Sequence, residues 1–324
     1  MKQALICCAI AFIVTAAIGP SVIRYLRKMK FGQKILEIGP KWHMNKQNIP
    51  TMGGFMFIIG IALAVILGGL ITGTLSVHAL AILGLSAAYG AVGLVDDYAK
   101  IKKKENAGLT PRQKLVLQIL VAAVFILVLF LKSDGLPSLM IPFTDISISL
   151  PWPVYIIFAA FVIVGADNAV NLTDGIDGLA ASVTVPVAVF FAAVGVRIGN
   201  TGVTAFAGAL AGGLLGFLIY NFNPAKVFMG DTGSLFLGGA VAGMAFACDM
   251  PLILLLVGLI YIIETLSVIL QVTYFKATHG KRLFKMAPIH HHFEMCGWGE
   301  KRIVLTFTAV TIVLCLAAYF VALP

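Results

Sequence analysis

The sequence predicts an all-α integral membrane protein with about ten transmembrane helices. Of its 324 residues, 60% are hydrophobic and only 11% are charged, whereas a soluble domain contains about 45–50% apolar and 25% charged residues. Mean hydropathy is +1.00. Apolar runs near the ~20 residues that a spanning helix needs recur along the whole chain. We therefore expect a single polytopic domain that covers residues 1–324.

Ten apolar segments are predicted as spans. They are residues 4–23, 53–71, 77–95, 115–131, 153–166, 179–196, 199–220, 235–248, 251–275 and 303–323. The first resembles a signal peptide, but one Lys before it and seven basic residues after it favour an uncleaved span. Alternating polar and apolar residues at 144–150 predict a short β-hairpin between spans four and five.

The distribution of Lys and Arg predicts the orientation. Of these 23 residues, seven lie at 24–46, six at 100–114 and six at 276–302, and Lys226 brings the predicted inner loops to 20. The positive-inside rule places such loops in the cytoplasm, so both termini and the hairpin are expected outside. The clusters are loops between spans rather than one basic domain, so nucleic-acid binding is not predicted.

The most unusual polar stretch is NAVNLTDGIDGLA at 168–180, which carries Asn168, Asn171, Asp174 and Asp177 between two apolar runs. Carboxylates at membrane depth are expensive and are usually functional. If the stretch is helical, Asn171, Asp174 and Asp177 share one face. Its glycines weaken a helix, so we expect a helix end that opens into a polar pocket. The alternative is a loop whose Asp and Asn cap a helix.

Two further carboxylate motifs stand at predicted inner ends of spans. Asp96 and Asp97 close the third span, with Lys100 one turn later, and such a pair suits a proton acceptor. The alternative is a solvated pair balanced by Lys100. Asp231 lies between glycines just before the eighth span, which fits a phosphate or Mg²⁺ site and fits a helix N-cap equally well.

Two more inner loops complete the set. Thr51, in PTMGG at 50–54, stands at a predicted helix start that leaves amides open to phosphate, or is simply capped. The run PIHHHFE at 288–294 cannot point three adjacent His side chains at one zinc ion. It suits hydrogen bonds to phosphate or sugar, or proton transfer near pH 7. Together the inner loops predict a Mg²⁺-dependent phosphoryl-transfer site at the cytoplasmic face.

These motifs resemble those of the polyprenyl-phosphate N-acetylhexosamine-1-phosphate transferases. The matching pieces are Lys46 with PTMGG at 50–54, DDY at 96–98, NAVNLTDGIDGL at 168–179, NFNPAKVFMGDTGS at 221–234 and PIHHHFE at 288–294. They occur in the family order, and the last piece is typical of the muramoyl-pentapeptide branch. The resemblance implies transfer of phospho-N-acetylmuramoyl-pentapeptide from UDP-MurNAc-pentapeptide to undecaprenyl phosphate. That reaction yields lipid I and UMP in the bacterial inner membrane, as the first membrane step of peptidoglycan synthesis.

The resemblance also implies the site residues. Mg²⁺ would be held by Asp231, Asp96 would be the base for the lipid phosphate with Asp97 beside it, and His290 would be catalytic. Phe228 would lie near the uracil. The remaining substrate-binding residues would be Lys46, Thr51, Lys100, Lys114, Asn168, Asn171, Asp174, Gly175, Asp177, Asn221, Gly230, Ser234, Gln271, His291 and His292.

Three other functions compete with this one. A sibling transferase would use a different donor such as UDP-N-acetylglucosamine. A proton-coupled transporter would use the carboxylates and His as a relay, but such groups lie near the membrane midplane in transporters, whereas here they gather at span ends. A membrane scaffold would leave the Asp-rich motifs without a role. The sequence leaves both a monomer and a homodimer open.

Overall fold

The computed structural model describes residues 1–29, 46, 49–73, 75–103, 108–132, 136–142, 144 and 146–321. Most of this part is helical. The elements are α1 (Lys2–Lys28), α2 (Gly54–Leu63), the π-helical turn η2 (Ala64–Gly68), α3 (Gly69–Thr72), α4 (Val77–Lys103), α5 (Pro111–Lys132), β1 (Ser138–Met140), β2 (Ser147–Ser149), α6 (Trp152–Thr173), α7 (Leu179–Arg197), α8 (Thr201–Asn221), α9 (Gly230–Ala247), the 3₁₀ turn η3 (Pro251–Ile253), α10 (Leu254–Val257), α11 (Leu259–Ala277), α12 (Ile289–Met295) and α13 (Glu300–Val321).

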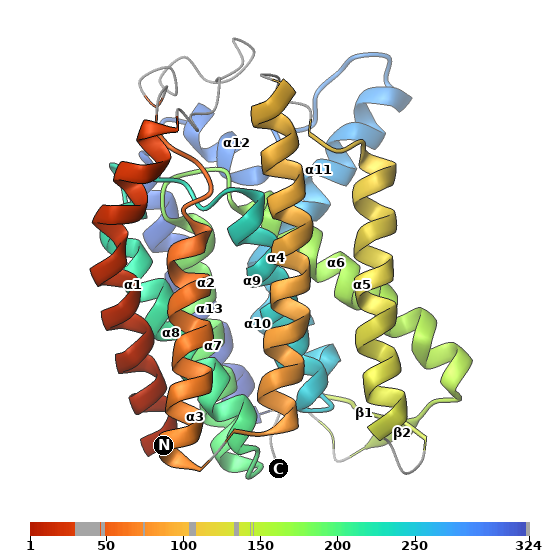
Figure 1. Cartoon of the computed structure of the whole chain (residues 1–324). Helices are drawn as coiled ribbons and strands as arrows, with labels where there is room; N and C mark the ends of the chain where they lie inside the picture. Colours follow the sequence, from red (N-terminus) through yellow and green to blue (C-terminus); the bar gives the residue numbers. More distant parts are fainter. Residues whose placement is uncertain are drawn as a thin grey trace.

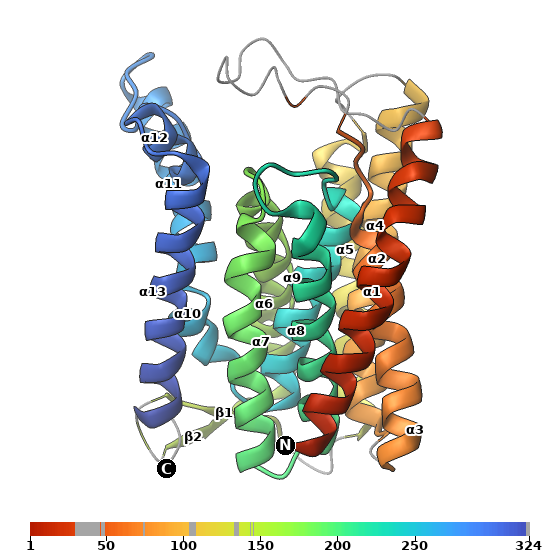
Figure 2. The same ribbon diagram turned by 90° about the vertical axis from the view of Figure 1, so that its left-hand side faces the viewer.

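The long helices lie side by side along one direction (Figures 1 and 2). Among the described residues, nine helices are long and apolar enough to cross a membrane, so the chain is a multi-pass membrane protein. Helix α9, at the place of the eighth predicted span, is not among the nine. Its first turn is polar and glycine-rich, from Gly230 to Ser234. The predicted count of ten is therefore not confirmed, although α9 packs lengthwise between α4 and α6.

Two predicted spans are not the continuous α-helices that their apolar runs suggested. Residues 251–275 form η3, α10 and α11, and the break falls at Gly258, where an added Cβ would lie 2.6 Å from the carbonyl oxygen of Leu254. Residues 53–71 contain the π-helical turn η2 between α2 and α3. Hydropathy alone carries no information on such local changes of winding.

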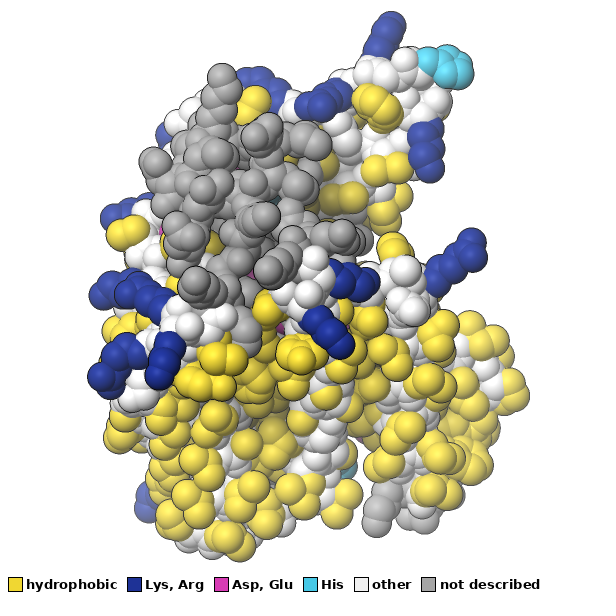
Figure 3. Space-filling view, turned by 45° about the horizontal axis from the view of Figure 1, so that its top comes forward, with side chains coloured by type: hydrophobic (Ala, Val, Ile, Leu, Met, Phe, Trp, Pro, Cys, Tyr) yellow, Lys and Arg dark blue, Asp and Glu magenta, His cyan; other side chains and the backbone are white. Residues whose placement is uncertain are grey.

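The two ends of the bundle differ. Helix α1 begins and α13 ends at the same end, where the hairpin also lies (Figures 1 and 2). The hairpin prediction is confirmed: β1 and β2 are antiparallel, with Ser138 opposite Ser149. Helix α12 lies at the other end, where Lys and Arg side chains gather above a mostly hydrophobic flank (Figure 3).

Helices α8 and α9 form the centre of the bundle and are buried along most of their length. Small residues allow this close packing, as is common between membrane helices. A Cβ on Gly208 or Gly212 of α8 would collide with the backbone of Ala4 or Cys8 in α1. Helix α9 begins at the end of the bundle that carries α12 (Figure 2).

Candidate active site

The N-terminus of α9 is fixed by Asp97 from the last turns of α4. Its carboxylate accepts the backbone N–H groups of Asp231 at 3.2 Å and Thr232 at 2.9 Å, and the Thr232 hydroxyl at 2.8 Å. A Cβ on Gly93 of α4 would run into the carbonyl oxygen of Asp231. Asp97 therefore supplies the cap that α9 needs, and Asp231 is left free of the capping role that the sequence had allowed for it.

Asp96, Asp97 and Asp231 form a compact carboxylate cluster. One oxygen atom from each lies within 4.8 Å of the others, a separation that a single divalent cation can bridge with hard oxygen ligands. Asp96 and Asp97 come from α4, and Asp231 comes from α9. The packing of Gly93 against α9 brings the two helices together at this point. These three residues can hold a metal ion.

Two lysines from different helices neutralise this cluster. Lys100 Nζ lies 2.7 Å from Asp96 Oδ2 and 2.9 Å from Asp231 Oδ2. Lys114 Nζ, from the first turn of α5, lies 3.0 Å from the same Asp231 oxygen. The other oxygen, Oδ1, accepts a hydrogen bond from Asn171 at 2.9 Å. The cluster thus joins α4, α5, α6 and α9.

The protonation state of Asp231 suits a metal ligand. Burial by itself would raise the pKa of this carboxyl group. The hydrogen bond with Asp96 and the charges of Lys114 and Lys100 outweigh burial, so the pKa of Asp231 is held well below its usual value. The group is therefore ionised at neutral pH.

A polar cavity of about 230 Å³ opens beside the cluster. The lining residues come from four separate parts of the chain: Lys46, Thr51, Asn171, Asp174, Gly175, Ile176, Asp177, Phe228, Gly230 and Asp231. All except Ile176 were predicted as site residues from the sequence. Burial, followed by the nearby carboxylates of Asp231, Asp97 and Asp177, raises the pKa of Asp174 well above its usual value.

Backbone pairing places two walls of this cavity. The Phe228 N–H donates to Pro50 O at 2.9 Å, and the Gly53 N–H donates back to Phe228 O at 2.8 Å. The Gly54 N–H continues the ladder to Met229 O at 3.0 Å. This pairing holds the segment that carries Thr51 against the segment that leads into α9.

Comparisons with known proteins show the family of this chain. A sequence model of glycosyl transferase family 4 matches residues 79–249. Similar proteins include the phospho-N-acetylmuramoyl-pentapeptide-transferases of Listeria monocytogenes serovar 1/2a, 46% identical over 305 residues and 94% of each chain, and of Clostridium perfringens strain 13, 49% identical over 310 residues and 96% of each chain. That of Bacillus cytotoxicus is 43% identical over 318 residues, or 98% of this chain and 97% of the relative. The chain belongs to the phospho-N-acetylmuramoyl-pentapeptide-transferase family.

In this transferase, Asp177 ties several loops together. Its Oδ1 lies 2.6 Å from Lys46 Nζ, and its Oδ2 accepts from Asn223 Nδ2 at 3.1 Å and Ala225 N–H at 2.9 Å. Glu300, at the start of α13, lies 2.7 Å from Lys46 and accepts the Asp177 N–H at 3.1 Å. Lys46 is therefore held by two carboxylates. Glu300 was not among the site residues predicted from the sequence, because its position in a basic loop does not indicate a role in the site.

Asn171, Asp174 and Asp177 do not share a helical face, because α6 ends at Thr173 and the condition of a continuous helix is not met. The turn that follows reverses the chain into α7, whose N-cap Gly178 has a φ of +79°. The companion expectation, a helix end that opens into a polar pocket, is confirmed. Asn171 remains on the helix and reaches Ser234 Oγ at 2.7 Å, whereas Asp174 and Asp177 lie on the turn.

Asn168 and Asn221, which were predicted to bind substrate, make hydrogen bonds within the protein. Asn168 Nδ2 donates to Gln118 Oε1 at 3.0 Å and to Val164 O at 2.8 Å. Gln118 Nε2 in turn donates to the buried Asp167 at 2.7 Å. Asn221 Nδ2 donates to Val227 O at 2.9 Å. None of these residues is in the described lining of the cavity.

The histidines and Gln271 lie behind or beside the cavity rather than in its described lining. His290 is fully buried and pairs with Glu264, and His291 Nδ1 lies 2.6 Å from Glu294. His292 accepts the Lys285 N–H at 3.1 Å, and the amide oxygen of Gln271 accepts two backbone N–H groups, at positions 283 and 284. Their predicted contacts with substrate stay predictions.

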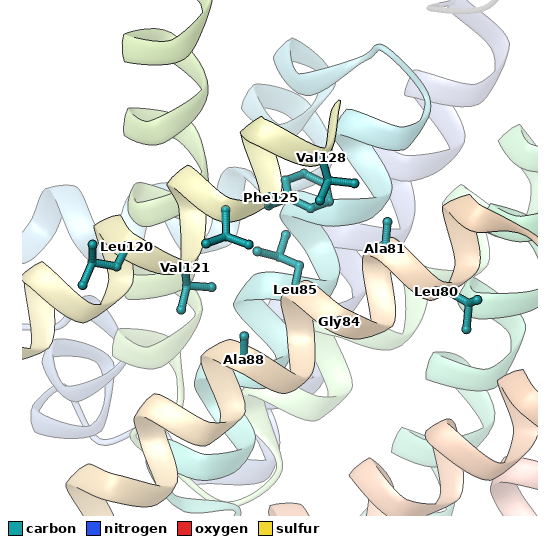
Figure 4. A pocket seen from close by; sticks show the side chains of 10 residues that line it. Leu80, Ala81, Gly84, Leu85, Ala88, Leu120, Val121, Phe125 and Val128 are labelled. Atoms are coloured by element: carbon teal, nitrogen blue, oxygen red, sulfur yellow. The ribbon is translucent and has the colours of Figure 1, made fainter. Parts of the chain in front are cut away.

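A second cavity, of about 480 Å³, lies between α4 and α5 and is lined by apolar residues. Figure 4 shows the side chains of Ala81, Leu85 and Ala88 of α4 on the side of that helix that faces α5. This cavity lacks ionisable groups, so it cannot carry acid–base or metal chemistry. The chemistry of the described chain is therefore assigned to the polar cavity.

Proposed function

We propose that this transferase moves phospho-N-acetylmuramoyl-pentapeptide from UDP-MurNAc-pentapeptide to undecaprenyl phosphate, with Mg²⁺ as cofactor. The products are lipid I and UMP. The observation that carries the proposal is the cluster of Asp96, Asp97 and Asp231 with Lys100 and Lys114, beside a polar cavity at one end of the membrane bundle. The names of the similar proteins support the same chemistry.

Each carboxylate and lysine of the cluster has a proposed role in the transfer. Asp231 would hold Mg²⁺, with Asp97 beside it, and the ion would neutralise phosphate charge when it is bound. Asp96 accepts a proton from the lipid phosphate, whose oxygen then attacks the donor phosphorus that bears the sugar. The bond from that phosphorus to the UMP oxygen breaks, and UMP leaves. Lys100 and Lys114 compensate the negative charge on the transferring groups.

The donor side of the cavity is proposed to bind the nucleotide and sugar phosphate. Phe228 offers a ring for the uracil, and Asn171, Asp174 and Asp177 offer hydrogen-bond partners for nucleotide and sugar. Lys46 and Thr51 would contact phosphate oxygens. Gln271 of α11 and His291 and His292 of α12 would contact the rest of the donor.

We place the active site at the cytoplasmic face of the bacterial inner membrane. The Lys and Arg side chains gather at the end of the bundle that carries α12 (Figure 3), and the hairpin and both terminal helix ends lie opposite. A cationic inner surface attracts both the anionic donor and anionic lipid. The acceptor is a lipid, so its phosphate meets the soluble donor there without crossing the membrane.

Donor competition tests this proposal. Purified protein with undecaprenyl phosphate and Mg²⁺ is expected to release UMP from UDP-MurNAc-pentapeptide, and UDP-N-acetylglucosamine is expected to be a poor donor in the same assay. Everted membrane vesicles should accept external donor, and right-side-out vesicles should not. Preferential consumption of UDP-N-acetylglucosamine would identify the sibling transferase instead. Activity with external donor only in right-side-out vesicles would reverse the orientation.

A further inference from the structure

Glu264 is a carboxylate in the middle of α11, one of the nine helices fit to cross a membrane. Its side chain is fully buried, with 0% exposure. A carboxylate at such a place is costly and is usually paired. Its Oε2 lies 3.0 Å from His290 Nδ1, while Oε1 has no hydrogen-bond partner among the described residues. Nothing in the proposed reaction uses this residue directly.

The pairing fixes which edge of the His290 ring faces Gly175. With Glu264 Oε2 as the acceptor, the shared hydrogen lies on Nδ1 of His290. Nε2 is therefore at the opposite edge of the ring, and it is buried without a hydrogen-bond partner among the described residues. That edge stands against Gly175, because a Cβ built on Gly175 would collide with Nε2. The His291 ring packs against the His290 ring, with centroids 4.1 Å apart.

Gly175 is the middle of the turn that forms one wall of the polar cavity. On one side of the turn, Asn171 is held by Asp231 and Ser234. On the other side, Asp177 is held by Lys46 and by the loop at 223–225. The His290 ring is the side chain that backs the turn between these two anchors. Its position therefore decides where Asp174 and Gly175 lie relative to the donor.

We propose that Glu264 is a positioning residue for the donor site. It holds His290 against Gly175, and His290 in turn holds the turn at 174–177 in the shape that binds the donor. The inference deepens the proposed function and rests on it for the identity of the donor. A displacement of about 1 Å at a reacting centre can cost about 100-fold in rate. Loss of Glu264 should therefore be felt in kcat/KM although it touches no substrate.

The test is a double-mutant cycle on the purified full chain. The variants are Glu264→Ala, Glu264→Gln, His290→Ala and the Ala/Ala double variant. Thr265→Ala is the control, because Thr265 is the next residue of α11 and its hydroxyl donates to Tyr261 O within the same helix. For each variant, kcat and KM for the UDP-linked donor and the Tm are measured. The Tm increase caused by UMP is recorded in parallel.

Glu264→Ala is expected to lower kcat/KM about 10- to 100-fold, and the double variant should be no worse than His290→Ala. Glu264→Gln should recover most of the loss, because its amide oxygen still accepts from Nδ1. Thr265→Ala should behave as wild type. A purely structural role would lower Tm and leave the kcat/KM of the folded protein unchanged, and independent effects would multiply in the double variant. Either result overturns the inference.

The UMP measurement separates this inference from the proposed reaction. If wild-type protein transfers from neither donor, the proposed function fails, and the Tm increase with UMP then decides the role of Glu264. A smaller increase in Glu264→Ala than in Thr265→Ala supports the positioning role. Equal increases in the two variants, or no increase even in wild type, overturn it.

Discussion

Asp231→Asn is expected to remove most transfer activity, by roughly 10²- to 10³-fold in kcat, and to weaken the dependence on Mg²⁺. An amide has no charge with which to hold a hard cation. The substitution also removes one negative partner from each of Lys100 Nζ and Lys114 Nζ, which lie 2.9 and 3.0 Å from Asp231 Oδ2. The measurement is the initial rate of UMP release as a function of Mg²⁺ concentration.

Asp249→Asn is the matched control for this change. Asp249 follows the other end of α9, outside the described lining of the cavity, so the same chemical change there should leave the rate and the Mg²⁺ requirement near wild type. If Asp231→Asn turns over normally at an unchanged Mg²⁺ requirement, Asp231 is not the metal ligand.

Asp96→Asn is expected to lower kcat by roughly 10²- to 10⁴-fold, the contribution typical of a general base, with the affinity for UMP preserved. Asp96 is buried, accepts the Leu109 N–H at 2.7 Å and pairs with Lys100. It is absent from the described lining of the cavity that is proposed to hold the nucleotide. Its loss should therefore slow proton removal from the lipid phosphate and leave nucleotide binding unchanged.

The comparison of UMP affinity with kcat decides this assignment. Equilibrium binding of UMP to the variant and to wild type should give the same Kd within about twofold, well below the 1.4 kcal/mol that corresponds to a tenfold change. A collapse of UMP affinity would show that Asp96 binds nucleotide or metal and does not act as the base.

Most of the fold and of the cavity could be predicted because they depend on local patterns. The apolar runs predicted a multi-pass helical protein, and period-two alternation predicted the hairpin, which pairs Ser138 with Ser149. Short polar motifs at span ends predicted nine of the ten residues that line the cavity. The chain places these motifs together because helices of similar length end at the same face of the bundle (Figure 1).

The remaining features depend on tertiary packing, which one sequence does not reveal. Glu264 pairs with His290, which stands 26 residues away in α12. Glu300 and Lys46 are 254 residues apart and meet only because α13 begins beside the cavity. Asp97 resembled a catalytic residue in the sequence, and the backbone N–H groups of α9 give it a capping role as well.

The most direct test of the central claim is to locate a divalent cation in the protein. Crystals grown with UMP and Mn²⁺ in place of Mg²⁺ would be measured for anomalous scattering. We predict a peak bound by a carboxylate oxygen of Asp231, at about 2.0–2.2 Å as for cations of this size, and within reach of Asp96 or Asp97. A fully occupied cation elsewhere, with Asp231 still paired only to Lys100 and Lys114, would contradict the assignment of this cluster as the metal site for phosphoryl transfer.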